Sequence, residues 1–158
     1  MALSSEKSAV RFEQYRKEDQ LPLIQALIDS DLSEPYSVFT YRYFLNQWPQ
    51  FSFLAMEGED CVGCIVCKLE KSAKRVLRGY IAMLAVRKDR RKCGLGSELV
   101  CTALQRMKES GCEEVVLEAE ESNRGALRLY SNLGFIRAKR LEKYYLNGSD
   151  AFRLKMTL

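Results

Sequence analysis

The sequence predicts a single α/β domain, with a mixed central sheet of about seven strands and about four helices. A chain of 158 residues, 47% of them apolar, is long enough for one domain with a substantial core. Hydrophobic periodicity along it gives the order β-α-α-β-β-β-α-β-α-β-β. Within that order, residues 79–120 form a strand–helix–strand unit, whose two strands should be parallel with a right-handed crossover. We expect residues 1–8 to be a flexible lead-in and residues 9–158 to form the domain.

The first half of the chain predicts a strand, two helices and a hairpin. Alternation in AVRFEQY indicates the strand, and a helix follows from Asp19, with Pro22 near its start. Pro35 restricts the residue before it, and Ser37 can cap a second helix, VFTYRYFLNQW, which ends before Pro49. FSFLAM and CVGCIVCKL, separated by the turn EGED, have the pattern of a β-hairpin.

The second half of the chain predicts the parallel unit and two closing strands. GYIAMLAV (79–86) is almost entirely apolar, so we expect a central strand covered on both faces. Apolar residues then recur at helical spacing from Gly94 to Gly111, and EEVVLEAE (113–120) is another buried strand. The short helix in SNRGALRLYSNLG ends at Gly134, and FIRAKRL and DAFRLKMTL finish the sheet. A ligand should lie beyond the carboxyl ends of the parallel strands.

The composition restricts the classes of function. The net charge of +4, from 25 basic and 21 acidic residues, is too balanced to indicate specific binding of nucleic acid. The sequence shows neither an apolar run of membrane-spanning length nor a secretory signal, so we expect no membrane partner and a cytoplasmic location with reduced cysteines. Because histidine is absent, acid–base chemistry must use Glu, Asp, Tyr, Cys, Lys or water.

The cysteines of CVGCIVC do not predict a metal site. In a regular strand Cys61 and Cys67 share one face and Cys64 points to the other. Neither a histidine nor a second C-x-x-C supplies the missing ligands. We therefore expect no metal cofactor.

The link after strand 79–86 reads RRKCGLGSELV (90–100). Glycines permit positive φ and a close approach of the backbone to a ligand. The first amides of the following helix are unpaired and lie at the positive end of its dipole. With Arg91 and Lys92 adding charge, the stretch indicates a phosphate-binding loop, and the alternative is a helix start with a solvated basic loop.

Two motifs resemble those of the GNAT acetyltransferase superfamily. LAVRKDRRKCGLGSELV fits its pattern Q/R-x-x-G-x-G/A as Arg91-x-x-Gly94-x-Gly96, and ESNRGALRLYSNLGF is similar to the next motif. Arg90 departs from the family, where an aromatic residue is usual at this place. The resemblance implies the GNAT fold and acetyl-CoA as cosubstrate, with its pyrophosphate on the glycine loop. The cofactor contacts that it implies are Leu84, Val86, Arg91, Lys92, Cys93, Gly94, Leu95, Gly96, Ser97, Asn123 and Tyr130.

Four further segments resemble one branch of that superfamily, the catalytic subunits of N-terminal acetyltransferase C (NatC). They are DLSEPYSVFTYRYFLNQWP, RGYIAMLAV, VVLEAE and YYLNGSDAFRLKM. The branch implies transfer of acetyl to the α-amine of protein N-termini that begin with Met and a hydrophobic residue such as Leu, Ile or Phe. It also implies nascent chains as substrates, large and small auxiliary subunits and a possible association with ribosomes. Helix 38–48 is a candidate contact for a subunit.

The resemblance assigns two catalytic residues. Glu118 would be the general base, directly or through a water, and Tyr130 the general acid that meets the CoA sulfur. From the residues alone, Glu118 could be a solvated strand end, Tyr130 a core residue and Asn123 a helix cap. The peptide groove implied by the family has as its walls Leu32, Glu34, Tyr36, Tyr80, Met83, Tyr144 and Tyr145. Transfer to other N-termini, to lysine or to a small amine is the alternative, as is a noncatalytic CoA-binding subunit.

Overall fold

The computed structural model describes residues 9–31 and 35–158. The lead-in 1–8 and two groove predictions, Leu32 and Glu34, therefore lie outside the described residues. The strands and α-helices are β1 (Arg11–Gln14), α1 (Leu21–Asp31), α2 (Val38–Gln47), β2 (Phe53–Glu57), β3 (Asp60–Lys71), β4 (Leu77–Val86), α3 (Leu95–Glu109), β5 (Glu114–Glu120), α4 (Arg124–Leu133), β6 (Ile136–Leu141) and β7 (Ala151–Thr157). Their order is the one that the periodicity predicts.

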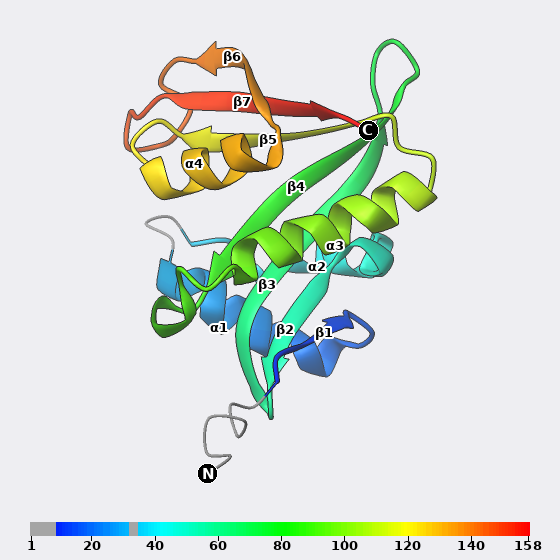
Figure 1. Cartoon of the computed structure of the whole chain (residues 1–158), viewed down its shortest axis with the longest axis vertical. Helices are drawn as coiled ribbons and strands as arrows, with labels where there is room; N and C mark the ends of the chain where they lie inside the picture. The colour runs from blue at the N-terminus through cyan, green and yellow to red at the C-terminus, as the bar shows by residue number, and fades with distance from the viewer. Residues whose placement is uncertain (1–8, 32–34) are drawn as a thin grey trace.

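All the described strands belong to one mixed sheet, in the order β1-β2-β3-β4-β5-β7-β6. The β4–β5 pair is parallel and the other neighbouring strands are antiparallel. Helices cover both faces (Figure 1): the core on one face contains side chains of α3 and α4, and the core on the other contains those of α1 and α2. None of the described helices is long and apolar enough to cross a bilayer.

Helix ends follow the sequence signals closely. The Ser37 side chain accepts a hydrogen bond from the backbone N–H of Thr40 and begins α2. The Asn123 side chain does the same for α4, accepting from the N–H of Ala126 at 3.1 Å. Gly134 ends α4 with a φ of 107°, a left-handed conformation that strains any residue with a Cβ. The predicted capping role of Asn123 is confirmed.

β4 and β5 separate soon after they begin. Their parallel pairing joins Arg78, Gly79 and Tyr80 to residues 114–116 and then ends, although β4 continues to Val86. Figure 1 shows the two strands starting together and running apart. A bulge accompanies the separation, because Cys67 of β3 pairs with Ile81 and Val66 with Met83, which leaves Ala82 without a partner. Bulges bend a strand and increase its twist, so this one turns β4 away from β5.

A second bulge corrects the prediction about the cysteines of β3. The register against β2 jumps from Gly63 to Cys61, so Val62 is the extra residue. The extra residue reverses the alternation of side chains between the two faces of the sheet. Cys61 therefore packs with Cys64 in the core beneath α1 and α2, whereas Cys67 belongs to the core on the opposite face. The predicted shared face of Cys61 and Cys67 is wrong, because it assumed an unbroken strand. All six cysteines are free thiols.

Close packing of β4 on α3 makes a first prediction. A Cβ added at Gly79 would lie 2.5 Å from Sδ of Met107, which is fully buried. Gly79→Ala should therefore lower the free energy of unfolding by about 1–3 kcal/mol, as overpacking does. Gly125→Ala is the matched control, since its Cβ would meet nothing closer than 3.9 Å and alanine favours the helix. Urea unfolding of both variants tests this, and equal stability of the two would contradict it.

Candidate active site

The separation of β4 and β5 opens a cavity of about 560 Å³ between them. One wall is β4, and the other is β5 with the start of α4. The loop after β6 and the entry to α2 form the rim. Its lining includes Asp31, Tyr36, Tyr80, Met83, Leu84, Glu118, Ala119, Asn123, Tyr130, Tyr144, Tyr145 and Leu146. Because β4 has no strand partner on this side beyond Tyr80, its backbone groups can bond to a ligand here.

Glu118 is the only carboxylate in this cavity that receives hydrogen bonds from two described tyrosines. Its Oε1 accepts from the hydroxyls of Tyr80 at 2.6 Å and Tyr144 at 3.3 Å. Its Oε2 accepts from Nε of Arg153 at 3.2 Å. The side chain is 6% exposed, so the reading of Glu118 as a strand end facing water is wrong. Burial of a carboxylate requires such donors, and they hold it in one orientation.

The tyrosines around Glu118 keep their protons at neutral pH. Burial, followed by the hydrogen bond to Glu118, raises the pKa of Tyr80 well above its usual value. Burial also raises the pKa of Tyr144, and the nearby charge of Glu118 adds to that effect. Both hydroxyls therefore act as donors, and Glu118 is left as the acceptor.

Tyr130 lies in the opposite wall from Tyr80. It is 4% exposed and its ring packs edge-on against Phe135, with the centroids 5.3 Å apart. Burial raises the pKa of its hydroxyl, which therefore stays protonated. Among the described residues no hydrogen-bond partner of this hydroxyl is found, although the residue lines the cavity. The core-packing reading of Tyr130 is confirmed, and its role toward the CoA sulfur stays a prediction.

Aromatic side chains from two loops face the cavity mouth. Tyr144 and Tyr145 precede β7 and stack edge-on, with their centroids 5.1 Å apart. Tyr36, just before α2, packs edge-on against Tyr41. Together with Met83 they give the mouth an apolar, aromatic character. The structure thus brings together every groove residue predicted within the described ranges.

The glycine loop continues from β4 and leads into α3, but its residues do not line the cavity. Gly94 has a φ of 86°, and a Cβ there would meet nothing within 4 Å, so the backbone conformation requires the glycine. Gly96 serves packing instead, since a Cβ there would lie 2.8 Å from Leu129 of α4. The predicted contacts of this segment are Val86, Arg91, Lys92, Cys93, Gly94, Leu95, Gly96 and Ser97, and they remain predictions.

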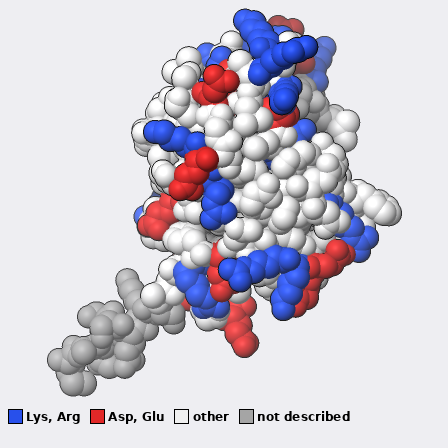
Figure 2. Space-filling model, turned by 90° about the vertical axis from the view of Figure 1, so that its right-hand side faces the viewer, with Lys and Arg blue, Asp and Glu red and all other residues white. Residues whose placement is uncertain are grey.

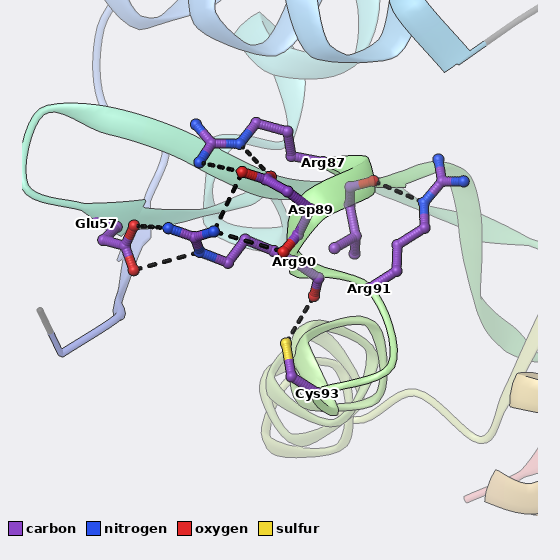
Figure 3. Close-up of polar contacts among 7 residues, drawn as sticks. Glu57, Arg87, Asp89, Arg90, Arg91 and Cys93 are labelled. Atoms are coloured by element: carbon purple, nitrogen blue, oxygen red, sulfur yellow. Dashed lines mark hydrogen bonds and ion pairs between the residues drawn. The ribbon is translucent and has the colours of Figure 1, made fainter. Parts of the chain in front are cut away.

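Several cations of the loop are bound to carboxylates of the chain itself (Figure 3). Arg90 donates to Glu57, the last residue of β2, and to Asp89, and Arg87 donates to Asp89 with Nε–Oδ1 at 2.6 Å. The hydrogen bond from Arg90 holds the pKa of Glu57 below its usual range. Arg90, which departs from the family pattern, therefore anchors the loop by charge.

Arg91 connects the loop to two other parts of the chain. Its Nε donates to the carbonyl oxygen of Val86 at 3.0 Å, and a terminal nitrogen pairs with Asp31 at the end of α1. Cys93 donates its thiol to the carbonyl oxygen of Arg90. Lys92, by contrast, forms no ion pair with a described carboxylate and has a φ of 63°. Lys88 and Lys92 are therefore the lysines of the loop without a described carboxylate partner, and Lys92 lies just before the N-cap of α3.

Charges on the face in Figure 2 are mixed. Lysine and arginine side chains gather at the upper and lower ends of this face, with acidic side chains beside them, and much of the middle is uncharged. This face therefore has no continuous basic stripe of the kind that nucleic-acid-binding surfaces show. No group of three or more described His, Cys, Asp or Glu side chains is arranged to hold a metal ion.

Sequence reasoning missed Glu120, which lines the cavity, and two further polar residues of the site. Arg153 lies directly opposite Glu118 in the β5–β7 pairing, a relation that only the strand register reveals. Asp31 lines the cavity and pairs with Arg91, 60 positions further along. Arg153 and Asp31 lie within segments that resemble the NatC branch, but nothing in those segments marks them as site residues, and only the folded chain places them beside the predicted residues.

The acetyltransferase (GNAT) family matches residues 21–135 of the chain. The fold, with a βαβ unit whose strands separate around a cavity, agrees with this match. The chain belongs to this family.

Within the family, the chain is similar to N-terminal acetyltransferases. It is 57% identical over 153 residues to human N-alpha-acetyltransferase 30, spanning 97% of the chain but 42% of that relative's length. It is 58% identical to N-alpha-acetyltransferase MAK3 of Arabidopsis thaliana, over 96% of the chain and 79% of the relative. A chain of the NatC complex bound to Gag peptide and CoA superposes with a TM-score of 0.90 at 44% identity, covering 94% and 98% of the two chains. The resemblance to the NatC branch is confirmed.

The buried tyrosines of the site predict how stability depends on pH. Unfolded tyrosines ionise near pH ~10, whereas Tyr80 and Tyr130 keep their protons in the folded state. The native state then binds more protons than the unfolded state, so stability falls as pH rises above that value. Tyr80→Phe should reduce the slope of the free energy of unfolding against alkaline pH by up to ~1.4 kcal/mol per pH unit, which is the contribution of one tyrosine. Urea unfolding across alkaline pH measures it, and an unchanged slope in Tyr80→Phe would contradict it.

Proposed function

We propose that the chain transfers the acetyl group of acetyl-CoA to the α-amine of a protein N-terminus, as a NatC-type catalytic subunit. One observation supports this most strongly: the same β4–β5 cavity is lined by a buried carboxylate, Glu118 of β5, and by a protonated hydroxyl, Tyr130 of α4. The similarity to N-alpha-acetyltransferase 30 and to a NatC chain bound to CoA and peptide supports it further.

Acetyl-CoA is assigned to the cavity and the glycine loop. The free edge of β4 beyond Tyr80 supplies backbone groups for the amides of the pantetheine arm. The pyrophosphate is assigned to the first amides of α3, with positive charge from Lys92 and Arg91. Leu84, Asn123 and Tyr130 are the predicted contacts that line the cavity.

Acetyl transfer requires two proton movements. A terminal amine with a pKa near ~8 is mostly protonated at neutral pH and must lose a proton to attack. Glu118, directly or through a water, accepts that proton; the nitrogen loses its second proton as the C–N bond forms, and this proton replaces the one that Tyr130 gives to the thiolate. The C–S bond then breaks, and the Tyr130 hydroxyl stabilises the departing thiolate and protonates it. Tyr80 and Tyr144 hold Glu118 in place and remain donors throughout.

The aromatic mouth suits an apolar N-terminus. Tyr36, Met83, Tyr144 and Tyr145 line it, and burying one large apolar side chain there stabilises binding by ~1.5–3 kcal/mol. We propose substrates that begin with Met followed by Leu, Ile or Phe. The apolar preference follows from the residues, and the preference for methionine rests on the NatC resemblance.

Auxiliary subunits are proposed partners. The NatC chain that this protein resembles comes from a complex. The surface of α2 carries the aromatic residues Phe39 and Tyr43, which are 74% and 43% exposed and suit a protein contact. The cytoplasmic location, nascent-chain substrates and ribosome association stay predictions of the sequence.

A peptide competition assay tests the proposed function. With acetyl-CoA, peptides beginning Met-Leu should be acetylated roughly ten- to a hundredfold faster than those beginning Met-Glu, Ser-Glu or Ala-Ala. Tyr130→Phe should reduce turnover on Met-Leu by ~10²-fold or more, with little change in CoA affinity.

The outcomes separate the alternatives. Faster acetylation of Ser-Glu or Met-Glu peptides would overturn the substrate assignment but leave an acetyltransferase. Transfer to lysine side chains instead of the terminal amine would overturn the N-terminal assignment. No transfer to any acceptor, with CoA still bound, would support a noncatalytic subunit.

A further inference from the structure

Arg153 of β7 is paired with Glu118 of β5 in the sheet. The two residues are directly opposite each other in the antiparallel register, so their side chains project from the same face. Nε of Arg153 donates to Oε2 of Glu118 at 3.2 Å. The other oxygen, Oε1, receives both tyrosine hydroxyls. Arg153 is therefore the donor that fixes the second oxygen of the carboxylate.

The charge balance makes this contact important. Glu118 is 6% exposed, and a carboxylate this deeply buried is strongly destabilised without a cationic or hydrogen-bonding partner. Among the described residues, Arg153 is the cation that forms an ion pair with it. Tyr80 and Tyr144 are neutral, so they orient the carboxylate without balancing its charge.

A like charge on the other side directs Arg153 toward Glu118. Lys139 of β6 is directly across from Arg153 in the β6–β7 pairing. Like charges in such positions repel, whereas opposite charges attract. Arg153 lies between a lysine and a carboxylate, so its guanidinium is favoured on the side of Glu118. The outer strand β6 thus contributes to the geometry of a residue on β5.

We propose that Arg153 is the positioning residue of the general base. It does not line the cavity, so it acts through Glu118 instead of touching the substrates. With Oε1 held by two hydroxyls and Oε2 held by Arg153, the carboxylate cannot rotate away from the cavity. This inference rests on the proposed acetyl transfer and deepens it, because it names how the base is held.

Steady-state kinetics with acetyl-CoA and a Met-Leu peptide test this positioning role in five proteins besides the wild type. They are Arg153→Met, Arg153→Lys, Glu118→Gln, the double variant Arg153→Met/Glu118→Gln, and Lys139→Met. Arg153→Met should lower kcat about ten- to a hundredfold through misplacement of the base, with KM for both substrates nearly unchanged. Arg153→Lys should keep an intermediate kcat, because it retains the charge but not the geometry of the guanidinium. Lys139→Met removes only the repulsion across the β6–β7 pair and leaves the hydrogen bond from Arg153 to Glu118, so its loss of kcat should be much smaller than that of Arg153→Met.

The double variant distinguishes positioning from general damage. If Arg153 acts only through Glu118, Arg153→Met should add no further loss to Glu118→Gln. The proposal would be overturned if the kcat losses of the two single variants multiplied in the double variant. A wild-type kcat in Arg153→Met, or a loss in Lys139→Met equal to that in Arg153→Met, would overturn it too. If Arg153→Met does not fold, as judged by circular dichroism, an unchanged kcat in Arg153→Lys overturns it and a reduced kcat supports it. A wild-type protein that binds CoA but acetylates no acceptor would overturn the proposed function, and this inference with it.

Discussion

The separation of two parallel strands is the constraint on which the rest of this site depends. β4 and β5 share three register pairs, and then β4 bulges at Ala82 and turns away. In a continuous sheet the space would be closed by backbone hydrogen bonds, and Glu118 and Tyr130 would have no cavity to line. The opening leaves an edge of β4 unpaired in the middle of the sheet, a state that proteins usually avoid. A ligand that offers amide groups can pair with that edge, and the proposed cosubstrate has such groups.

Placing a charge inside the sheet requires support from several elements. Glu118 lies in an apolar strand and is held by Tyr80 of β4, Tyr144 of the loop before β7 and Arg153 of β7. In the glycine loop the charges that need partners are positive: Glu57 binds Arg90 and Asp31 binds Arg91. Much of the basic charge that the sequence displays is therefore used within the chain. The proposed phosphate binding relies on backbone amides, on Lys92 and on Arg91, which also pairs with Asp31.

The element order, the parallel unit, the helix caps and nine of the twenty cavity-lining residues could be predicted from the sequence. Those features are set by local periodicity and by short motifs. The features that were predicted wrongly or missed depend on the register between segments that are distant in the sequence. The bulge at Val62 reversed the facing of Cys61, and no local pattern marks it. Arg153 is one of several basic residues near the C-terminus, and only its pairing with Glu118 distinguishes it. Arg90 was recognised as a departure, but its partner Glu57 lies 33 positions away.

Hydrogen–deuterium exchange with and without acetyl-CoA tests the central claim most directly, because it reports on the free edge of β4 itself. Amides of residues 82–86 that do not bond to β3 should exchange fast in the free protein and become protected when acetyl-CoA is added. Amides at the start of α3, from Leu95 to Ser97, should become protected with them. Protection confined to other parts of the chain, with the β4 edge unchanged by saturating acetyl-CoA, would contradict the account.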